Sequence, residues 1–150
     1  MLIQKALPAQ AAILTNIALA AKRHWGYPER WIEIWTPLLT ITPEFITGGD
    51  VWVAEVAGEV TGFYALLFEE QRASLEHLWI LPSHIGQGIG RALFEHALGR
   101  SRERECHILE IVSDPNAQGF YEKMGAEKVG VNLSEIDGEL RSLAILEVGL

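Results

Sequence analysis

One segment decides the fold of this chain: Leu78-Trp79-Ile80-Leu81-Pro82-Ser83-His84-Ile85-Gly86-Gln87-Gly88-Ile89-Gly90-Arg91-Ala92-Leu93. It starts as an apolar strand, crosses a short loop after Pro82 and continues into a helix. Gly86, Gly88 and Gly90 stand at alternate positions where the loop meets the helix. Backbone N–H groups without neighbouring side chains can approach an anion closely, and a helix N-terminus adds about half a positive charge. A phosphate or pyrophosphate is therefore the natural ligand of this segment.

Two common phosphate motifs fit this loop less well. A P-loop needs Gly-Lys-Ser or Gly-Lys-Thr at the helix start, and the chain has Gly90-Arg91-Ala92. A Rossmann fingerprint follows the first strand of a βαβ unit, whereas this loop follows the last strand of an antiparallel meander. Asp114 stands about 24 residues after Gly90, so the spacing alone leaves a dinucleotide site open. A turn without any ligand is the remaining alternative, although one or two glycines would suffice for it.

The flanking sequence predicts one α/β domain over residues 1–150, with a mixed, mostly antiparallel central sheet flanked by helices. Apolar alternation and turn signals predict strands over 2–7, 51–56, 60–68, 74–81, 107–112, 126–131 and 140–148. The turns include Gly58-Glu59 and Asp137-Gly138. Helical spacing predicts helices over 8–23, 89–102 and 114–124. We expect the last helix to begin at Asp114-Pro115, with Asp114 as N-cap, and to end at Gly125.

The segment 24–45 is rich in tryptophan and proline. We expect short helices joined by turns, one of them carrying Trp31, Ile34, Trp35 and Leu38 at helical spacing. An aromatic stripe of this kind more often packs in a core than binds a ligand.

Composition excludes several classes of protein. The chain carries 12 Lys and Arg against 20 Asp and Glu, a formal net charge of −8, which argues against nucleic acid and anionic membranes as partners. No apolar run approaches the roughly 20 residues that span a bilayer, and residues 1–6 resemble a strand more than a signal peptide. The single cysteine, Cys106, indicates a reducing compartment and a cytoplasmic location. The histidines show no metal-ligand spacing, so we expect no metal site.

Two blocks of the sequence resemble the GCN5-related N-acetyltransferases, the GNAT superfamily. That family has Gln or Arg, two residues, Gly, one residue, then Gly or Ala, and this chain has Ile85-Gly86-Gln87-Gly88-Ile89-Gly90. The second block, residues 114–126, is similar to the family's helix with Phe-Tyr, three residues, then Gly. Ile85 departs from the family's Gln or Arg, and Asp114 stands where many members have asparagine. The resemblance extends across nearly the whole chain.

The resemblance implies that the chain binds acetyl-CoA. Main-chain groups of Leu78, Trp79 and Ile80 would pair with the pantetheine arm as if it were an added strand. The pyrophosphate would be held by a run of backbone amides: Gly86, Gln87, Gly88, Ile89, Gly90 and Arg91. Asn116 is expected to take over the contact that the family's asparagine makes, if Asp114 only caps a helix.

Acetyl transfer to an amine needs a base, an oxyanion donor and an acid for the departing thiolate. The resemblance gives Tyr121 the role of acid, and the backbone N–H of Leu78 is the expected oxyanion donor. Glu76, two residues before Leu78, is the expected base: it would take the proton through a water, or only attract a cationic amine. Strand alternation places His77 on the opposite face, and Glu110 is a further candidate for the base.

We therefore expect an N-acetyltransferase that moves the acetyl group from acetyl-CoA to a primary amine of a small molecule or peptide. The acceptor is expected between the segment 24–45 and the ends of the later strands. Tyr27 and the tryptophans would form an apolar or cation-attracting wall there, and Glu29, Glu33 and Glu44 would add negative potential, which suits a small amine better than an acidic substrate. The alternative is a non-catalytic acyl-CoA-binding or regulatory domain of the same fold, and a different nucleotide-binding domain is a third. The sequence leaves the acceptor's identity and the choice of monomer or homodimer open.

Overall fold

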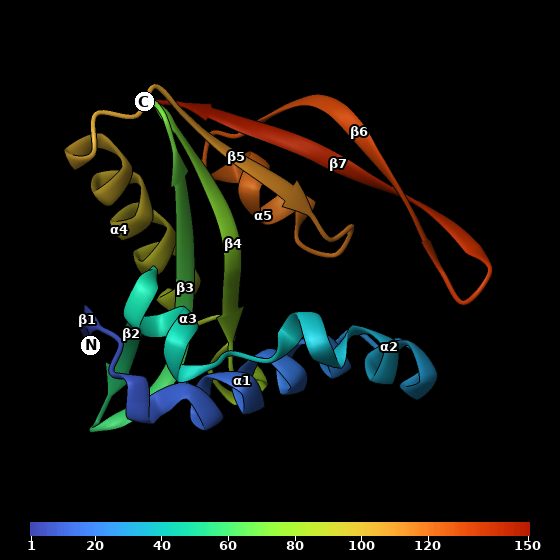
Figure 1. Ribbon diagram of the computed structural model, residues 1–150, viewed down its shortest axis with the longest axis horizontal. Helices are drawn as coiled ribbons and strands as arrows, with labels where there is room; N and C mark the ends of the chain where they lie inside the picture. The colour runs from blue at the N-terminus through green and yellow to red at the C-terminus, as the bar shows by residue number, and fades with distance from the viewer. The chain divides into compact units, whose positions relative to one another are not determined.

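A computed structural model describes all residues 1–150. Its seven-stranded sheet has the order β1-β2-β3-β4-β5-β7-β6 (Figure 1). The strands are β1 (Leu2–Lys5), β2 (Asp50–Val56), β3 (Glu59–Glu69), β4 (Arg72–Ile80), β5 (Ile108–Ser113), β6 (Glu127–Ile136) and β7 (Glu139–Gly149). The β4–β5 pair is parallel, whereas β1–β2, β2–β3, β5–β7 and β6–β7 are antiparallel. This confirms the predicted mixed, mostly antiparallel sheet.

The helices follow the predicted order along the chain. They are α1 (Ala11–His24), α2 (Glu29–Leu39), α3 (Pro43–Gly48), α4 (Ile89–Glu103) and α5 (Gln118–Lys123), with short 3-10 turns η1 (Pro8–Gln10) and η2 (Pro82–His84). The chain divides into two compact units, Met1–Leu66 with Glu76–Ala97 and Leu67–Leu75 with Leu98–Leu150. Each unit is described by itself.

In the first unit, the core gathers apolar residues of α1 and of the ends of α2 and α3 against β2 and β3. Its members include Leu14, Ile17, Ile46, Val51 and Phe63, all 2% exposed or less. The β2–β3 hairpin turns at Ala57-Gly58, where φ is 52° and 81°, one residue earlier than the sequence predicts. Two consecutive positive φ values match the twist of the flanking strands, which explains the two-residue turn.

The face of α2 that is buried differs from the predicted one by about one residue along the helix. Ile34 and Leu38 are 44% and 73% exposed, whereas Ile32 and Leu39 are buried. Trp35 belongs to both stripes and packs partly against the core. The sequence offers two helical stripes that share Trp35 and each contain one isoleucine and one leucine, and packing against α1 decides which of them is buried. Pro37 lies inside α2, in its last turn, and the helix continues to Leu39.

In the second unit, β6 and β7 form a long two-stranded ribbon that turns at Asp137-Gly138 (Figure 1). The predicted turn is confirmed, with φ of 48° and 82°. Strand β6 continues five residues beyond its predicted end at Val131, through the polar positions Asn132 and Ser134. Apolar and polar residues alternate as far as Ser134, so the sequence signal for the strand extends past Val131, and pairing with β7 carries the strand on to Ile136.

The predicted start of α5 at Asp114-Pro115 is also wrong, because α5 begins at Gln118 after the N-cap Ala117. Asp114 instead closes a turn, since its Oδ1 accepts hydrogen bonds from the Asn116 backbone N (2.8 Å) and Nδ2 (2.9 Å). The Ala117 N–H donates to the Asp114 carbonyl at 2.9 Å. An aspartate that bonds the backbone two residues ahead favours a turn over helix propagation. Gly125, with φ of 100°, ends the helix as predicted.

Candidate functional site

The glycine loop between β4 and α4 has the backbone conformation of an anion cradle. Gly86 and Gly88 have φ of 84° and 81°, values that residues with a side chain rarely adopt. A Cβ added at either residue would meet nothing within 4 Å, so glycine is required by the backbone rather than by space. The first helical hydrogen bond of α4 runs from the Ala92 N–H to the Gly88 carbonyl at 3.1 Å. The preceding N–H groups have no acceptor within the helix and lie at the positive end of the 15-residue α4, where a bound anion would be stabilised.

The two side chains around this loop contribute little positive charge to it. Ile85 is 48% exposed at the position where the resembling family has Gln or Arg. The Arg91 guanidinium Nε lies 3.0 Å from Glu95 on the next turn of α4, in an exposed i,i+4 ion pair. Anion binding by this loop would therefore depend on backbone dipoles.

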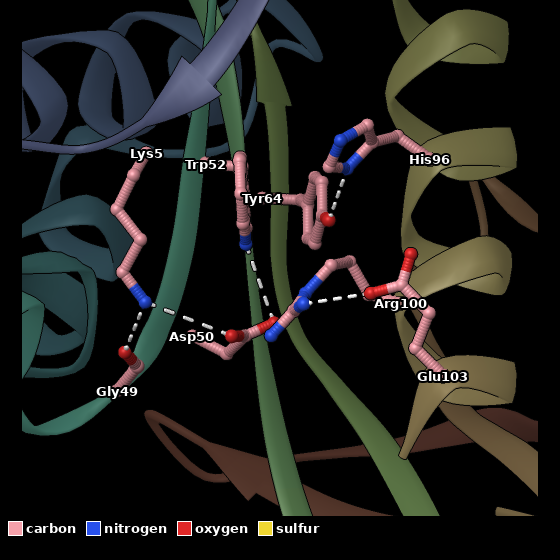
Figure 2. A network of polar contacts seen from close by, with 8 residues as sticks. All are labelled: Lys5, Gly49, Asp50, Trp52, Tyr64, His96, Arg100 and Glu103. Atoms are coloured by element: carbon pink, nitrogen blue, oxygen red, sulfur yellow. Dashed lines mark hydrogen bonds and ion pairs between the residues drawn. The ribbon is translucent and has the colours of Figure 1, made fainter. Parts of the chain in front are cut away.

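Helix α4 is held in place by its apolar face and by one polar contact that the sequence reasoning missed. Ile89, Leu93 and Phe94 are 2% exposed or less. The Tyr64 hydroxyl of β3 lies 2.6 Å from His96 Nδ1 of α4, and Figure 2 shows the two side chains facing each other. The sequence shows only that His96 stands beside the apolar face of the helix. A histidine at such a position has many possible partners, so the sequence does not identify Tyr64.

The Tyr64–His96 contact belongs to a larger polar cluster on β2. The ring centroids of Trp52 and His96 are 4.7 Å apart. Trp52 Nε1 donates a hydrogen bond to Asp50 Oδ2 at 3.3 Å. Lys5 Nζ lies 3.7 Å from Asp50 Oδ1 and donates to the Gly49 carbonyl, so β1 is tied to the same cluster (Figure 2). Because Asp50 is buried, these donors compensate the cost of desolvating its carboxylate.

The second half of β4 lies beyond its pairing with β5. The register with β5 covers Arg72–Ser74, so the half-buried residues Leu78, Trp79 and Ile80 come after its end. On the β3 side the backbone approach is close, because a Cβ on Gly62 would lie 2.9 Å from the Trp79 carbonyl oxygen. Gly62 therefore allows β3 to reach this part of β4.

The candidate bases Glu76 and His77 have opposite surroundings. Glu76 is exposed, whereas the His77 ring packs against Phe45 and Phe63, with ring centroids 5.9 Å away in each case. Burial lowers the pKa of His77 to about 4. Trp79 Nε1 donates a hydrogen bond to His77 Nδ1 at 2.9 Å, so the proton of the neutral ring is on Nε2 and the lone pair of Nδ1 is occupied. His77 is thus a hydrogen-bond donor and not a base.

The third candidate base, Glu110, is engaged in ion pairs across the second unit. Arg72 Nη2 lies 2.9 Å from Glu110 and 3.0 Å from Glu147, and both glutamates raise the pKa of the arginine. The Glu110 carboxylate is therefore occupied by a cation. Glu76 is the carboxylate without such a partner in the described contacts and remains the candidate base.

Tyr121, the expected acid, is buried in the second unit at 7% exposure, with its ring edge against Phe120. Burial raises its pKa well above the ordinary value, and the negative charge of Asp114 raises it further. The phenol therefore keeps its proton throughout the physiological pH range. Asp114 also lies 4.0 Å from Arg141 and holds Asn116 through both of its amide nitrogens, so Asn116 is fixed within its own turn.

The aromatic residues of segment 24–45 surround a lysine. Tyr27, Trp31 and Trp35 contact one another, with ring centroids 5.0 to 5.8 Å apart. Lys22 Nζ of α1 lies over the rings of Trp35 (4.1 Å), Tyr27 (5.1 Å) and Trp79 (5.8 Å). Sequence reasoning missed Lys22, although it continues the buried Leu14–Ala18 spacing of α1 by one more turn.

No group of three or more His, Cys, Asp or Glu side chains is placed to hold a metal ion. No helix has the length and apolar character needed to cross a bilayer.

Comparison with known proteins decides the family. The model of the acetyltransferase (GNAT) domain matches residues 47–125, more than half of the chain. The chain belongs to this GNAT family. The match includes the glycine loop, Glu76 and Tyr121, and it leaves out α1 and α2 with Lys22 and its aromatic partners.

Individual GNAT relatives agree with this assignment. The peptidyl-lysine N-acetyltransferase YjaB of Salmonella typhimurium is 36% identical over 98 residues, which cover 65% of this chain and 62% of the relative. The structure of a GCN5-related N-acetyltransferase from Rhodopseudomonas palustris superposes with a TM-score of 0.84 at 22% identity, covering 99% of this chain and 95% of that one. The PaiA N-acetyltransferase of Thermoplasma acidophilum, solved in complex with coenzyme A, gives 0.76 at 18% identity, covering 99% and 98%.

The first curated relatives are longer than the part matched. The chain spans 46%, 65% and 62% of the length of the first three. The structural likenesses, all below 25% identity, establish the GNAT fold.

Proposed function

We propose that the chain is an acetyl-CoA-dependent N-acetyltransferase that acts on a primary amine of a small molecule or peptide. The proposal treats residues 1–150 as one N-acetyltransferase domain and places it in the cytoplasm, in keeping with the single, unpaired Cys106. Membership of the GNAT family supports the reaction class.

The observation that carries the proposal is the glycine loop at the start of α4. Two residues with positive φ and a 15-residue helix behind them suit the pyrophosphate of coenzyme A. The amides of Gly86, Gln87, Gly88, Ile89, Gly90 and Arg91 would hold it. The main chain of Leu78, Trp79 and Ile80, which lies beyond the β4–β5 register, would pair with the pantetheine arm. Asn116 would add a side-chain contact.

Acetyl-CoA would supply the activated acetyl group, and the residues of the chain would orient it and handle protons. Glu76 would remove the proton of the acceptor ammonium, through water because its carboxylate is solvated. The Leu78 N–H would donate to the developing oxyanion. Tyr121 would stabilise the departing sulfur by a hydrogen bond. The phenol, which its raised pKa keeps protonated at neutral pH, would pass its proton to that sulfur as the thiolate leaves and take a proton back from the acetylated nitrogen or from solvent.

Two observations favour the alternative of a non-catalytic acyl-CoA-binding domain. Ile85 offers no polar group to the ligand, and Asp114 and Asn116 bond each other where a family asparagine would contact it. Both features concern how the chain would contact coenzyme A, which the enzyme and the non-catalytic domain would both bind. Only the enzyme would release free thiol from acetyl-CoA, so this release distinguishes the two candidates.

The test measures coenzyme A binding by calorimetry and thiol release from acetyl-CoA with a panel of amines. Wild type should bind and release thiol. Gly88→Glu should weaken binding at least about 100-fold, because a carboxylate would stand next to the diphosphate. Gly138→Glu is the matched control, since its φ of 82° equals that of Gly88 within a degree or so and its turn joins β6 to β7.

Tyr121→Phe should slow thiol release by about 10- to 100-fold and leave coenzyme A affinity unchanged. Tight binding with no turnover on any amine would favour the non-catalytic domain. Equal coenzyme A affinity in wild type and Gly88→Glu would rule out the loop as the pyrophosphate site.

A further inference from the structure

The outer edge of the second unit is a strand with a neighbour on one side only. Strand β6 stands last in the sheet order, so a row of its backbone N–H and C=O groups faces away from β7 (Figure 1). Such an edge is a template for another strand, and proteins often block it with proline, a bulge or a short strand. β6 has ten residues and no proline, and its bulge lies between Lys128 and Gly130. The regular run 130–136 is therefore open to a further strand.

The same edge carries exposed apolar side chains on one face of the sheet. Val131, Leu133 and Leu140 are 45%, 67% and 73% exposed. Val131 pairs with Ala144, and alternate residues of a strand share a face, so all three side chains lie on the face where Ala144 is buried. The pairing of β7 with β5 ends at Ala144. The core face of this unit thus continues outward along the β6–β7 ribbon, where its apolar side chains are exposed.

Two opposite charges flank this apolar stretch. Lys128 pairs with Leu146 ahead of the bulge, and Glu135 pairs with Leu140, so both charged side chains lie on the same face as the exposed apolar residues. Both are exposed, and neither forms an ion pair within the chain. The face therefore has a cation at one end, an anion at the other and apolar side chains between them.

We propose that a second copy of this chain covers the edge, and that the two β6 strands pair antiparallel about a two-fold axis at Asn132. In this register Val131 lies opposite Leu133 of the second copy. Because the bulge takes one residue out of the ladder, Lys128 lies opposite Glu135 of the second copy. The symmetry repeats each contact, so the interface has two apolar pairs and two ion pairs on one face of a continuous sheet.

Neighbouring registers lack this complementarity. Residues opposite each other in an antiparallel pair share a face, so the two-fold axis passes through a residue and the register changes in steps of two. With the axis at Val131, Lys128 would lie opposite Leu133 and form no ion pair. With the axis at Leu133, the apolar Val131 would lie opposite Glu135. The self-complementarity of the Asn132 register is the observation that favours a second copy over a different protein.

Sedimentation equilibrium over about 1 to 100 μM protein measures the association. Wild type should sediment with twice the mass of the chain at the upper end of this range. Lys128→Glu and Glu135→Lys should each raise the dimer dissociation constant at least about 10-fold, because each places like charges opposite each other at two positions. A wild type that stays monomeric at about 100 μM would overturn the inference and leave the edge to a different protein or to a peptide.

An equal mixture of the two single variants tests whether the charges meet between copies. A Lys128→Glu subunit has two carboxylates at these positions and a Glu135→Lys subunit has two ammonium groups, so both contacts of the mixed dimer join opposite charges. The mixture should therefore associate at least about 10-fold more tightly than either variant alone. The double variant Lys128→Glu/Glu135→Lys should also recover the wild-type association. Failure of both to recover would overturn the proposed register.

The matched controls are Lys123→Glu and Glu139→Lys. They make the same changes of charge at exposed positions of the same unit, Lys123 on α5 and Glu139 on the other face of the ribbon, opposite Ile136. Both should keep the wild-type dissociation constant. Leu133→Ser should raise this constant at least about 10-fold, because it removes an apolar contact at two places.

Circular dichroism of each variant establishes that it is folded. A dimer that none of the β6 variants weakens, or that the two controls weaken equally, would use another surface and would overturn the inference. The inference does not depend on the proposed function, because the association is measured without acetyl-CoA or an amine.

Discussion

At the scale of single residues, the neighbours of a titratable group decide whether it can act as a base. Glu76 and His77 are adjacent in β4, yet one is solvated and the other lies among aromatic rings. Intrinsic pKa values would favour His77 as the base at neutral pH. Its burial and the hydrogen bond from Trp79 reverse that preference, because they keep the ring neutral and occupy its lone pair.

Replacing His77 by Asn should remove part of the acid sensitivity of the fold. The pKa of His77 is lowered to about 4, against 6.5 in the unfolded chain, so between these values only the unfolded state binds the proton. Stability is therefore lost as pH falls from about 6.5 toward 4, by about 2 kcal/mol at pH 5. Asn can still accept from Trp79 and does not titrate.

Urea unfolding of both proteins at pH 7 and pH 5 measures this difference. The drop in unfolding free energy from pH 7 to pH 5 should be smaller in His77→Asn by about 2 kcal/mol. Identical drops in the two proteins would show that His77 is protonated in the folded state, against its burial.

At the scale of elements, α4 links the glycine loop to the sheet. Its first residues follow the loop, its apolar face is buried, and His96 joins it to Tyr64 of β3 (Figure 2). The loop is therefore positioned by contacts up to two turns further along the helix. The packing of α4 fixes where the loop lies. The positive φ values of Gly86 and Gly88 fix its backbone conformation.

Tyr64→Phe should destabilise the fold by about 1 to 2 kcal/mol, because it removes one partner of a short, buried hydrogen bond. A double-mutant cycle with His96→Ala isolates the pair, and its coupling energy should be about 1 kcal/mol. The measurement is the free energy of urea unfolding for the four proteins. Strictly additive effects would mean that the two side chains lie close without stabilising each other.

At the scale of the whole molecule, the negative net charge of the chain repels the proposed ligand, coenzyme A. The chain carries −8, coenzyme A is also anionic, and the loop offers backbone dipoles in place of basic side chains. Long-range repulsion is screened by salt, whereas short-range N–H contacts are affected little. A site of this kind differs from the basic patches that bind nucleic acids, where salt weakens binding steeply.

Coenzyme A affinity should therefore stay level or rise a few-fold as salt increases from about 50 to 300 mM. Calorimetry at several salt concentrations measures it, with pantetheine, which lacks the phosphates, as the control whose affinity should not change. A fall of tenfold or more would point to basic side chains as the main contacts of the phosphates and would contradict a backbone cradle.

What the sequence determined by itself concerns features that are local along the chain. The apolar face of α4, the glycines before it, the Asp137-Gly138 turn and the glycine end of α5 all follow from neighbours within a few residues. Helical periodicity, turn conformations and the need for glycine at positive φ act over that range. The GNAT resemblance rests on the same local blocks, and the family match confirms it.

Only the tertiary structure decided the contacts between residues far apart in the sequence. It selected which stripe of α2 is buried, paired Tyr64 with His96 and placed Lys22 among Tyr27, Trp35 and Trp79. In each case several local choices cost nearly the same free energy, and burial against another element chose among them. The contacts of Lys22 are the clearest example, because this residue belongs to α1, whereas Trp35 lies in α2 and Trp79 in β4.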